Sequence, residues 1–425
     1  QVRVVRINFV LCSAAMAFSA EKCLKLASKG GDWVAQQLLD TDEDRLPVAF
    51  GDWFKAPLAL AQCGNTFAGN AVLDRILRRF GGGPSSEGIF EKRAEKSDMS
   101  FGNIMYCYRQ AVCLTGAAAL GRWDVASRTA TAAALACQEA CGEGLQKAGK
   151  DVIGWGHGGI VSATPTAMMG LYLVHRNELQ AATKVGNLFV EMLYERQSQA
   201  SRVGCLYFCW DAQHGHLLTD DYVAEHEELA WFGERRVLRC VDSTCERQHN
   251  YLPGLAAAFL AELYAATQES KYIDAAWHLM EFDRQCHVVK HWPSHCKAAW
   301  GAANVLRFSP PSERNTNRWA SLLVHLQQVT DHSLIANAQA SGSFGRFHFP
   351  LHDFAVTRVR AGMLHYSDEP DIIVGKHMII GTELNLSAEF IYELCYVARG
   401  LASTAEVGDA PSPKIEPEAK RLRSE

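Results

Sequence analysis

The chain has 425 residues, a formal net charge of −5, 48% hydrophobic residues and 21% charged residues. This balance is that of an ordinary folded protein, and it excludes a mainly disordered chain and a collagen-like fibre. The small negative charge gives no basic surface for nucleic acid. The sequence contains no run of eighteen or more apolar residues, which is the length that a membrane-spanning helix needs. We therefore expect a soluble folded protein with neither nucleic acid nor a membrane span.

The two ends of the chain differ from the rest. Residues 1–20 place a basic VRVVR before an apolar INFVLCSAAMAF, an order found in signal peptides, but the same residues could form an outer helix. Residues 401–425 are polar and rich in proline, which predicts a disordered tail. The main domain is then expected over residues 21–400. We expect an intracellular compartment such as the cytoplasm, with secretion as the minority alternative.

Fourteen cysteines are spread along the chain without a framework spacing. Several lie in apolar helical stretches, where a reduced cysteine behaves as a small hydrophobic side chain: Cys63, Cys107, Cys113, Cys137 and Cys395. Pairs of cysteines four residues apart lack a second matching pair that a zinc site would need. The cysteines are therefore predicted to be reduced core thiols.

Between the ends, amphipathic and apolar helices alternate. Apolar residues recur every three or four positions, and the chain is predicted to be all-α. In chain order the predicted helices are 24–39, 53–64, 66–80, 101–120, 122–141, 158–175, 177–197, 251–267, 271–286, 294–307, 314–330 and 383–400. The helices of this series alternate in character, beginning with an amphipathic one. The even-numbered helices are apolar on all sides, as expected for an inner ring that is buried on both sides, and the odd-numbered helices have one polar face. Six of each kind predict a closed double ring with the first helix beside the last. An open helical solenoid is the alternative.

The connections between the predicted helices alternate in length. Those from an inner to an outer helix are short, whereas those from an outer to an inner helix are long: 40–52, 81–100, 142–157, 198–250, 287–293 and 331–382. All long connections then lie on one face, above the N-terminal ends of the inner helices. Long loops on a rigid scaffold commonly carry binding sites. Within 198–250, LYFCWD and HGHLLTD predict a small β-hairpin over this face.

Three segments resemble the (α/α)6 toroid proteins, which include terpenoid cyclases, protein prenyltransferases and six-hairpin glycosidases. They are QASGSFG (339–345), LAAAFLAELYAATQESKYIDAAW (255–277) and NLSAEFIYEL (385–394). The resemblance implies an (α/α)6 toroid of six inner and six outer helices, but toroids support many chemistries. The Asp-x-Asp-Asp acid motif of cyclases and the Asp/Cys/His zinc set of prenyltransferases are both missing from this sequence.

Candidate site residues were selected by their position at or just before the inner helices. His, Glu and Asp exchange protons near neutral pH, and aromatic rings can stack on a ligand. The predicted catalytic residues are His157, His249, Tyr251, His295, Glu389 and, from the hairpin, Asp211. The predicted substrate-binding residues are Trp53, Lys55, Asn103, Tyr106, Trp155, His214, Lys297, Trp300 and Glu383. Each histidine has an equally good interpretation as a structural residue. Glu389 stands in an apolar helix, where a carboxylate is costly unless it is paired or faces a polar cavity.

The function predicted from these residues is cofactor-independent acid–base chemistry on a small organic or sugar-like substrate. Cyclisation, isomerisation, elimination and glycoside cleavage all remain open. The sequence contains neither a G-x-x-x-x-G-K-[ST] phosphate loop nor a G-x-G-x-x-G between a strand and a helix, so no nucleotide is expected. The hairpin offers His-x-His and carboxylates but no third fixed ligand, so no metal ion is expected either. A non-catalytic toroid that binds a small ligand or a protein partner is the alternative, and the sequence predicts no oligomeric state.

Overall fold

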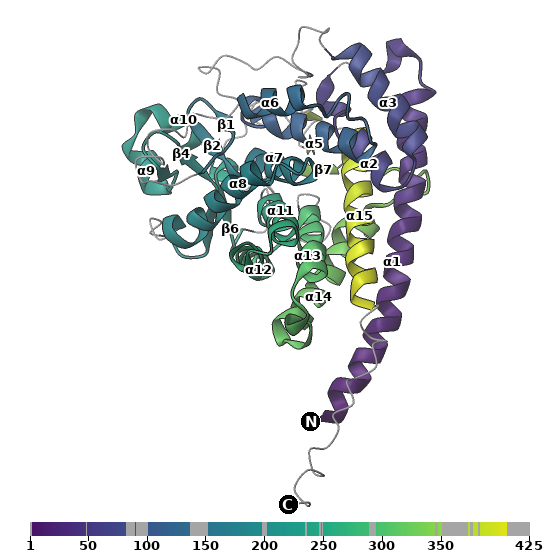
Figure 1. The fold of residues 1–425 in the computed structure, drawn as a ribbon, viewed down its shortest axis with the longest axis vertical. Coiled ribbons are helices and arrows are strands. Elements are labelled where there is room, and N and C mark those ends of the chain that lie inside the picture. Colours follow the sequence, from purple (N-terminus) through teal and green to yellow (C-terminus); the bar gives the residue numbers. More distant parts are fainter. Residues whose placement is uncertain are drawn as a thin grey trace, which may run out of the picture.

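The chain is described by a computed structural model (Figure 1). It describes residues 2–47, 49–81, 90, 101–136, 152–197, 202–233, 236–245, 248, 250–288, 295–344, 347–350, 373–374, 377–380 and 383–405.

Six apolar helices of the described chain form a closed inner ring. They are α2 (Ala56–Gln62), α5 (Tyr106–Ala119), α7 (Ala163–His175), α11 (Tyr251–Thr267), α13 (Cys296–Phe308) and α15 (Glu383–Ala405). Each packs on the next, and α15 packs back on α2. Most side chains of α5, α7 and α11 are buried, because these helices are covered on both sides.

Six amphipathic helices cover the inner ring from outside. They are α1 (Val2–Leu39), α3 (Thr66–Arg79), α6 (Arg128–Ala136), α8 (Leu179–Glu191), α12 (Ser270–Gln285) and α14 (Asn317–Val329). Each packs on an inner helix, and α1 lies along α15 (Figure 1). The fold is an (α/α)6 toroid. The predicted closure of the first helix against the last is confirmed, and the open solenoid is excluded.

Residues with a positive φ stand at the short breaks that end the inner helices. Gly64 (φ 86°) and Gly121 (φ 73°) end the first two, and Asn177 (φ 58°) and Gln268 (φ 60°) end the next two. This left-handed conformation stops a helix and is easiest for glycine. Asn65 then caps α3 by accepting a hydrogen bond from the Ala68 N–H. The sequence thus builds each short turn locally.

Several helix bounds differ from the prediction. The segment expected as a helix from 158 begins as strands β1 (Gly156–His157) and β2 (Ile160–Ser162), and α7 starts only at Ala163. α1 is one continuous helix back to Val2, and its N-terminal part projects beyond the other helices (Figure 1). α15 continues to Ala405. The rest of the predicted tail, 406–425, lies outside the described residues.

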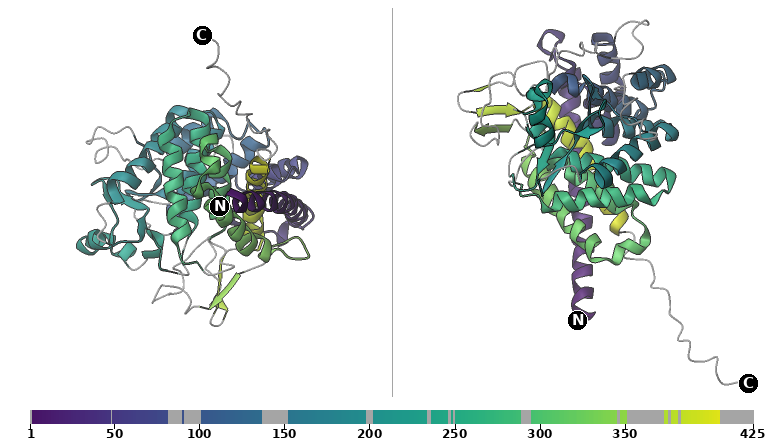
Figure 2. Two further views of the ribbon diagram at one scale, coloured as in Figure 1. Left: turned by 90° about the horizontal axis from the view of Figure 1, so that it is seen from below. Right: turned by 90° about the vertical axis from the view of Figure 1, so that its left-hand side faces the viewer.

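Small antiparallel sheets are built into the long connections. The predicted hairpin is confirmed as β4 (Cys209–Asp211) and β5 (His216–Leu217), with Trp210 opposite Leu217. It extends a sheet of order β1-β2-β4-β5. A second sheet pairs β3 (Cys205–Tyr207) with β6 (Cys240–Asp242). A third, β7 (Phe347–Pro350), β9 (His377–Ile380) and β8 (Ile373–Val374), protrudes from the helices (Figure 2).

Two general expectations can be compared with the described residues. The described cysteines from Cys23 to Cys395 are all free thiols, and most are buried. The predicted core residue Cys137 lies outside the described residues. None of the described helices is long and apolar enough to cross a membrane.

Candidate functional site

A network of buried charged side chains joins three inner helices. Lys55, just before α2, donates hydrogen bonds from Nζ to Glu389 Oε2 and Asn385 Oδ1, both at 2.6 Å. Lys297, in the first turn of α13, forms an ion pair with the other oxygen of Glu389 and lies 3.5 Å from Glu393 Oε1. The side chains of the two lysines and the two glutamates are all buried, with exposed fractions of 9% or less. We call these five residues the lysine–glutamate network.

The helical repeat explains why the network forms. Asn385, Glu389 and Glu393 are four residues apart on α15, so they lie on one face of the helix. Lys55 and Lys297 enter from the N-terminal ends of α2 and α13, which adjoin α15 on its two sides. The closure of the ring therefore brings two ammonium groups to two carboxylates.

Burial changes the proton affinities in this network. Burial lowers the pKa of Lys55 to about 8, although nearby acidic groups oppose the change. Burial likewise lowers the pKa of Lys297. It raises the pKa of Glu393 against the opposing effect of Lys297 and Lys55. Within the described residues, Oε2 of Glu393 is buried and has no hydrogen-bond partner. The pKa values of the two lysines and of Glu393 are therefore shifted towards neutral pH.

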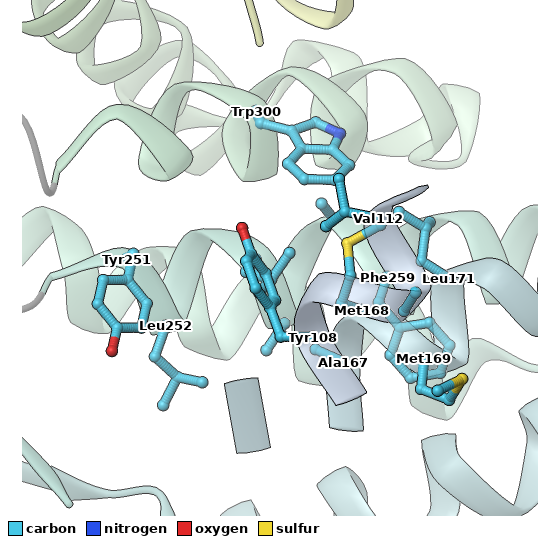
Figure 3. Packing of buried hydrophobic residues seen from close by; sticks show 14 of the residues in the cluster. Tyr108, Val112, Ala167, Met168, Met169, Leu171, Tyr251, Leu252, Phe259 and Trp300 are labelled. Atoms are coloured by element: carbon cyan, nitrogen blue, oxygen red, sulfur yellow. The ribbon is translucent and has the colours of Figure 1, made fainter. Parts of the chain in front are cut away.

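Aromatic side chains surround the network. The ring of Trp300 stacks on Tyr396 at 4.8 Å and meets Tyr392 edge-on at 5.6 Å. Tyr108 approaches from α5, with Lys297 Nζ 5.9 Å from its ring centre. Figure 3 shows Tyr108 with Trp300 and Tyr251 on separate sides of it. Burial raises the pKa of Tyr108, and acidic neighbours including Tyr251 add to the effect. This wall keeps the local environment largely apolar.

Part of this region has the geometry of a cation site. Single ligand atoms of Cys296, Glu389 and Glu393 lie within 4.8 Å of one another. However, Lys55 and Lys297 already engage both oxygens of Glu389, and two ammonium groups would repel a cation. Burial also raises the pKa of the Cys296 thiol, which disfavours the thiolate that binds metals. The network is therefore better suited to proton transfer than to metal binding.

The hairpin carries a second, more exposed group of ionisable side chains. Asp211 Oδ2 accepts hydrogen bonds from His214 Nδ1 at 2.6 Å and from the Tyr222 hydroxyl at 3.0 Å. Burial opposes ionisation of Asp211, but these bonds lower its pKa overall. The same contact raises the pKa of His214, whose side chain is 59% exposed. Asp211 and His214 thus form a hydrogen-bonded pair at the hairpin.

Three of the predicted residues point away from the ring centre. His295 contacts Asp283 of the outer helix α12, and Trp155 donates its indole N–H to Ala134 O of the outer helix α6. Trp53 donates to Pro47 O and packs edge-on against Phe80. These three side chains thus contact the outer helices or a connection, whereas Glu389 contacts Lys55 and Lys297. The first residues of a helix point in different directions, so a position near its start does not fix the side chain's direction.

The remaining predicted residues lie on other elements of the ring and its connections, or outside the described part. His157 is fully buried in β1, against which the short helix α4 (Phe101–Ile104) packs with half-buried Asn103. Tyr106 and Tyr251 are buried first residues of α5 and α11. His249 lies outside the described residues, and Glu383 begins α15 with a side chain that the structure does not describe.

A groove of about 630 Å³ lies on the outer surface. Its lining comes mainly from the outer helices α12 and α14 and includes Trp277, His278 and Arg318. The Arg318 guanidinium covers the Trp277 ring at 4.7 Å, and Tyr194 packs edge-on against His278. Because Arg318 already covers the Trp277 ring, this groove is a weaker candidate than the ring centre.

No protein-family model matches the chain, and no curated protein matches it. Among solved structures, the GH76A α-1,6-mannanase of Salegentibacter sp. HEL1_6 is similar, with a TM-score of 0.49 and 11% identity over 89% of this chain and 99% of that chain. An inactive double Asp-to-Asn variant of that mannanase, in complex with α-1,6-mannotriose, has a TM-score of 0.47 and 12% identity over the same shares. At this identity the likeness concerns the fold alone.

Several residues of the lysine–glutamate network and of the other buried polar contacts are not among the residues predicted from the sequence. Asn385 and Glu393 stand four residues on either side of Glu389, and this spacing on an apolar helix is a signal that could have identified them. Tyr108 and Cys296 look like ordinary core residues in the sequence. Asp283 and His325 lie on outer helices, where polar residues are expected, so the sequence contains no signal for them.

Proposed function

We propose that this protein is a cofactor-independent acid–base enzyme acting on a small sugar-like molecule at the lysine–glutamate network. The observation that carries the proposal is the state of Glu393. Its Oε2 is buried and has no hydrogen-bond partner among the described residues, and burial raises its pKa. A buried polar atom without a partner is costly, so either a proton or a ligand group is needed there.

The two carboxylates of the network have different surroundings, which suits two different roles. Glu389 lies between the ammonium groups of Lys55 and Lys297, which stabilise its negative charge. Glu393 has one longer contact with Lys297, at 3.5 Å, and holds its proton more tightly than an exposed glutamate. Two carboxylates in unequal environments form the usual pair of a general acid and an ionised partner. We assign Glu393 as the acid and Glu389 as the ionised partner.

Within acid–base chemistry, this pair favours glycoside cleavage. That reaction needs one protonated carboxyl group to donate to the leaving oxygen and one ionised carboxylate beside the sugar ring. Oxygens of Glu389 and Glu393 lie within 4.8 Å of each other, close to the spacing of roughly 5–5.5 Å in retaining enzymes. Lys55 and Asn385 offer hydrogen-bonding groups for hydroxyls. Isomerisation or elimination would instead use Lys55, with its pKa of about 8, as the base.

One observation favours a non-catalytic toroid as the second candidate. The ionisable groups of the network are almost closed to solvent, and most of their polar atoms are satisfied by one another. Such a network could serve only to hold α2, α13 and α15 together. A ligand or protein partner would then bind elsewhere, for example at the hairpin.

The test measures turnover of a panel of sugars, with proton NMR used to monitor the reaction. The panel contains monosaccharides and oligosaccharides of several linkages, with α-1,6-linked mannotriose as one member. We expect Glu393→Gln and Glu389→Gln each to lower kcat by at least about 100-fold, the usual contribution of a general acid or base. Circular dichroism shows whether each variant is folded.

The matched control is Glu269→Gln at the start of α12, where the exposed glutamate pairs with Lys271. It should leave turnover unchanged. Full turnover by both network variants would place the chemistry elsewhere, and Asp211→Asn would then test the hairpin. If sugars that bind are not turned over by the wild type, the non-catalytic candidate replaces the enzyme.

A further inference from the structure

A second buried cluster lies on the other side of the start of α13. Asp283, near the end of α12, accepts hydrogen bonds at one oxygen, Oδ2, from the Nε2 atoms of His295 at 3.0 Å and His325 at 2.8 Å. His295 directly precedes α13, and His325 lies in α14. Three helices thus each direct one nitrogen or oxygen ligand to a common point, and the ligand atoms all lie within 4.8 Å of one another.

The second oxygen of Asp283 supports a ligand at this point independently. The carboxylate is 0% exposed, and within the described residues its Oδ1 has no hydrogen-bond partner. A buried carboxylate with an unsatisfied oxygen is expensive unless a proton, a water molecule or a cation compensates it. Two imidazoles and a carboxylate are also the donor set that binds divalent transition metals in proteins.

We propose that Asp283, His295 and His325 bind one divalent transition-metal ion of the class of Zn²⁺. Zinc–nitrogen and zinc–oxygen bonds of about 2.0–2.2 Å put tetrahedral ligand atoms about 3.4 Å apart. The observed separations of 2.8 and 3.0 Å therefore need to widen by only about half an ångström. Each neutral imidazole binds the ion through Nε2 and carries its proton on Nδ1. No metal ion was predicted from the sequence, where the only ligand set considered was that of the hairpin; Asp283, His295 and His325 are separated by 12 and 30 residues in the chain.

The site would position the lysine–glutamate network without taking part in its chemistry. His295 faces the outer helices, whereas Lys297, two residues later, faces the ring centre. An ion held by α12, α13 and α14 fixes the start of α13 and with it Lys297. The inference goes beyond the proposed function, and its readouts are metal content and ligand type, which do not depend on turnover.

The test uses the full chain, stripped with a chelator and reloaded with Zn²⁺ or Co²⁺. We expect one equivalent of metal per chain after gel filtration, and a visible Co²⁺ spectrum. X-ray absorption at the cobalt edge should show nitrogen and oxygen ligands only. Asp283→Asn and His325→Gln keep the size and hydrogen-bonding ability of the side chains and should weaken binding at least about tenfold. His278→Gln, an exposed histidine on the same α12, is the control and should still bind one equivalent.

Three results would overturn the proposal. The first is wild-type protein that retains no stoichiometric metal. The second is sulfur among the ligands and the third is undiminished binding by both variants, because either would assign the ion to other residues. The absorption measurement needs only the wild type, so the proposal can be decided even where a variant fails to fold.

Discussion

Glu393 is the residue whose protonation should be visible without any substrate. Burial raises its pKa above the ordinary 4.5, so the folded state binds its proton more tightly than the unfolded chain does. The stability that this proton contributes is complete below about pH 4.5 and is lost as the pH rises through the raised value. Glutamine has no such proton. We predict that the free energy of unfolding of the wild type, relative to Glu393→Gln, falls as the pH rises from 4.5 to 8 in urea titrations.

The control for this prediction is Glu269→Gln, an exposed residue. Its urea midpoints should follow those of the wild type at every pH. A difference between wild type and Glu393→Gln that stays constant with pH would show that burial does not perturb Glu393.

Lys297 tests whether the charges of the network depend on one another. Removing one partner of a buried ion pair typically costs about 3–5 kcal/mol, because a charge is left uncompensated. We predict a loss of that size for Lys297→Met. In the double variant Lys297→Met/Glu393→Gln part of the loss should return, since one carboxylate is gone. The measurement is a double-mutant cycle from urea unfolding, and strictly additive losses would contradict the coupling.

Individual residues also show which side-chain positions could be predicted from the sequence and which could not. Glu389 could be identified because a carboxylate in an apolar helix needs a partner, and Lys55 and Lys297 because they begin inner helices. His295 belongs to the same class by position yet faces outward, because side chains two apart on a helix point to nearly opposite sides. An error of two residues in the predicted helix start therefore reverses the direction assigned to a side chain. The contact of Asp283 with two histidines depends on three-dimensional packing alone.

At the scale of elements, α11 and α13 pack so closely that side chains are excluded between them. A Cβ on Gly254 would collide with Lys297 O and Ala298 N, and Gly301 lies against the Gly254 backbone. We predict that Gly254→Ala lowers the free energy of unfolding by about 1–3 kcal/mol, as overpacking does. It should also weaken the proposed activity, because the collision displaces Lys297.

Gly233→Ala is the matched control in α10 (Ala230–Gly233). Its added Cβ would meet only Val223 Cγ1 at 3.4 Å, so its urea midpoint should stay near that of the wild type. Equal stability of the Gly254 and Gly233 variants would contradict the close packing of α11 and α13.

The elements themselves were largely predictable, because burial on both sides or on one side leaves a clear pattern in the sequence. All twelve ring helices stand where apolar and amphipathic stretches alternate. The exception before α7 has a physical reason. GWGHGGIVS (154–162) is apolar enough for an inner helix, but its strand β1 pairs with β2 and β2 pairs with β4. The partner strand β4 lies about fifty residues later in the chain. The third sheet likewise depends on distant pairing.

At the scale of the whole molecule, the closed ring predicts that the first and last ring helices unfold together with the helices between them. α15 packs on α1, α2 and α13, so no ring helix is an exposed terminal repeat. In an open solenoid, by contrast, each repeat contacts only its neighbours and the ends can open first. Hydrogen exchange followed by mass spectrometry should therefore give residues 24–39 and 384–400 protection comparable to that of α7. Much faster exchange at both ends would contradict ring closure in solution.

The central claim is that the lysine–glutamate network is where this toroid binds its substrate. The most direct measurement is a crystal structure of the protein with a sugar that binds it in solution, using Glu393→Gln to prevent turnover. The account predicts ligand density within hydrogen-bond reach of Lys55, Glu389 and the substituted residue 393. Density at the hairpin beside Asp211 and His214, with the network unchanged and closed, would contradict it.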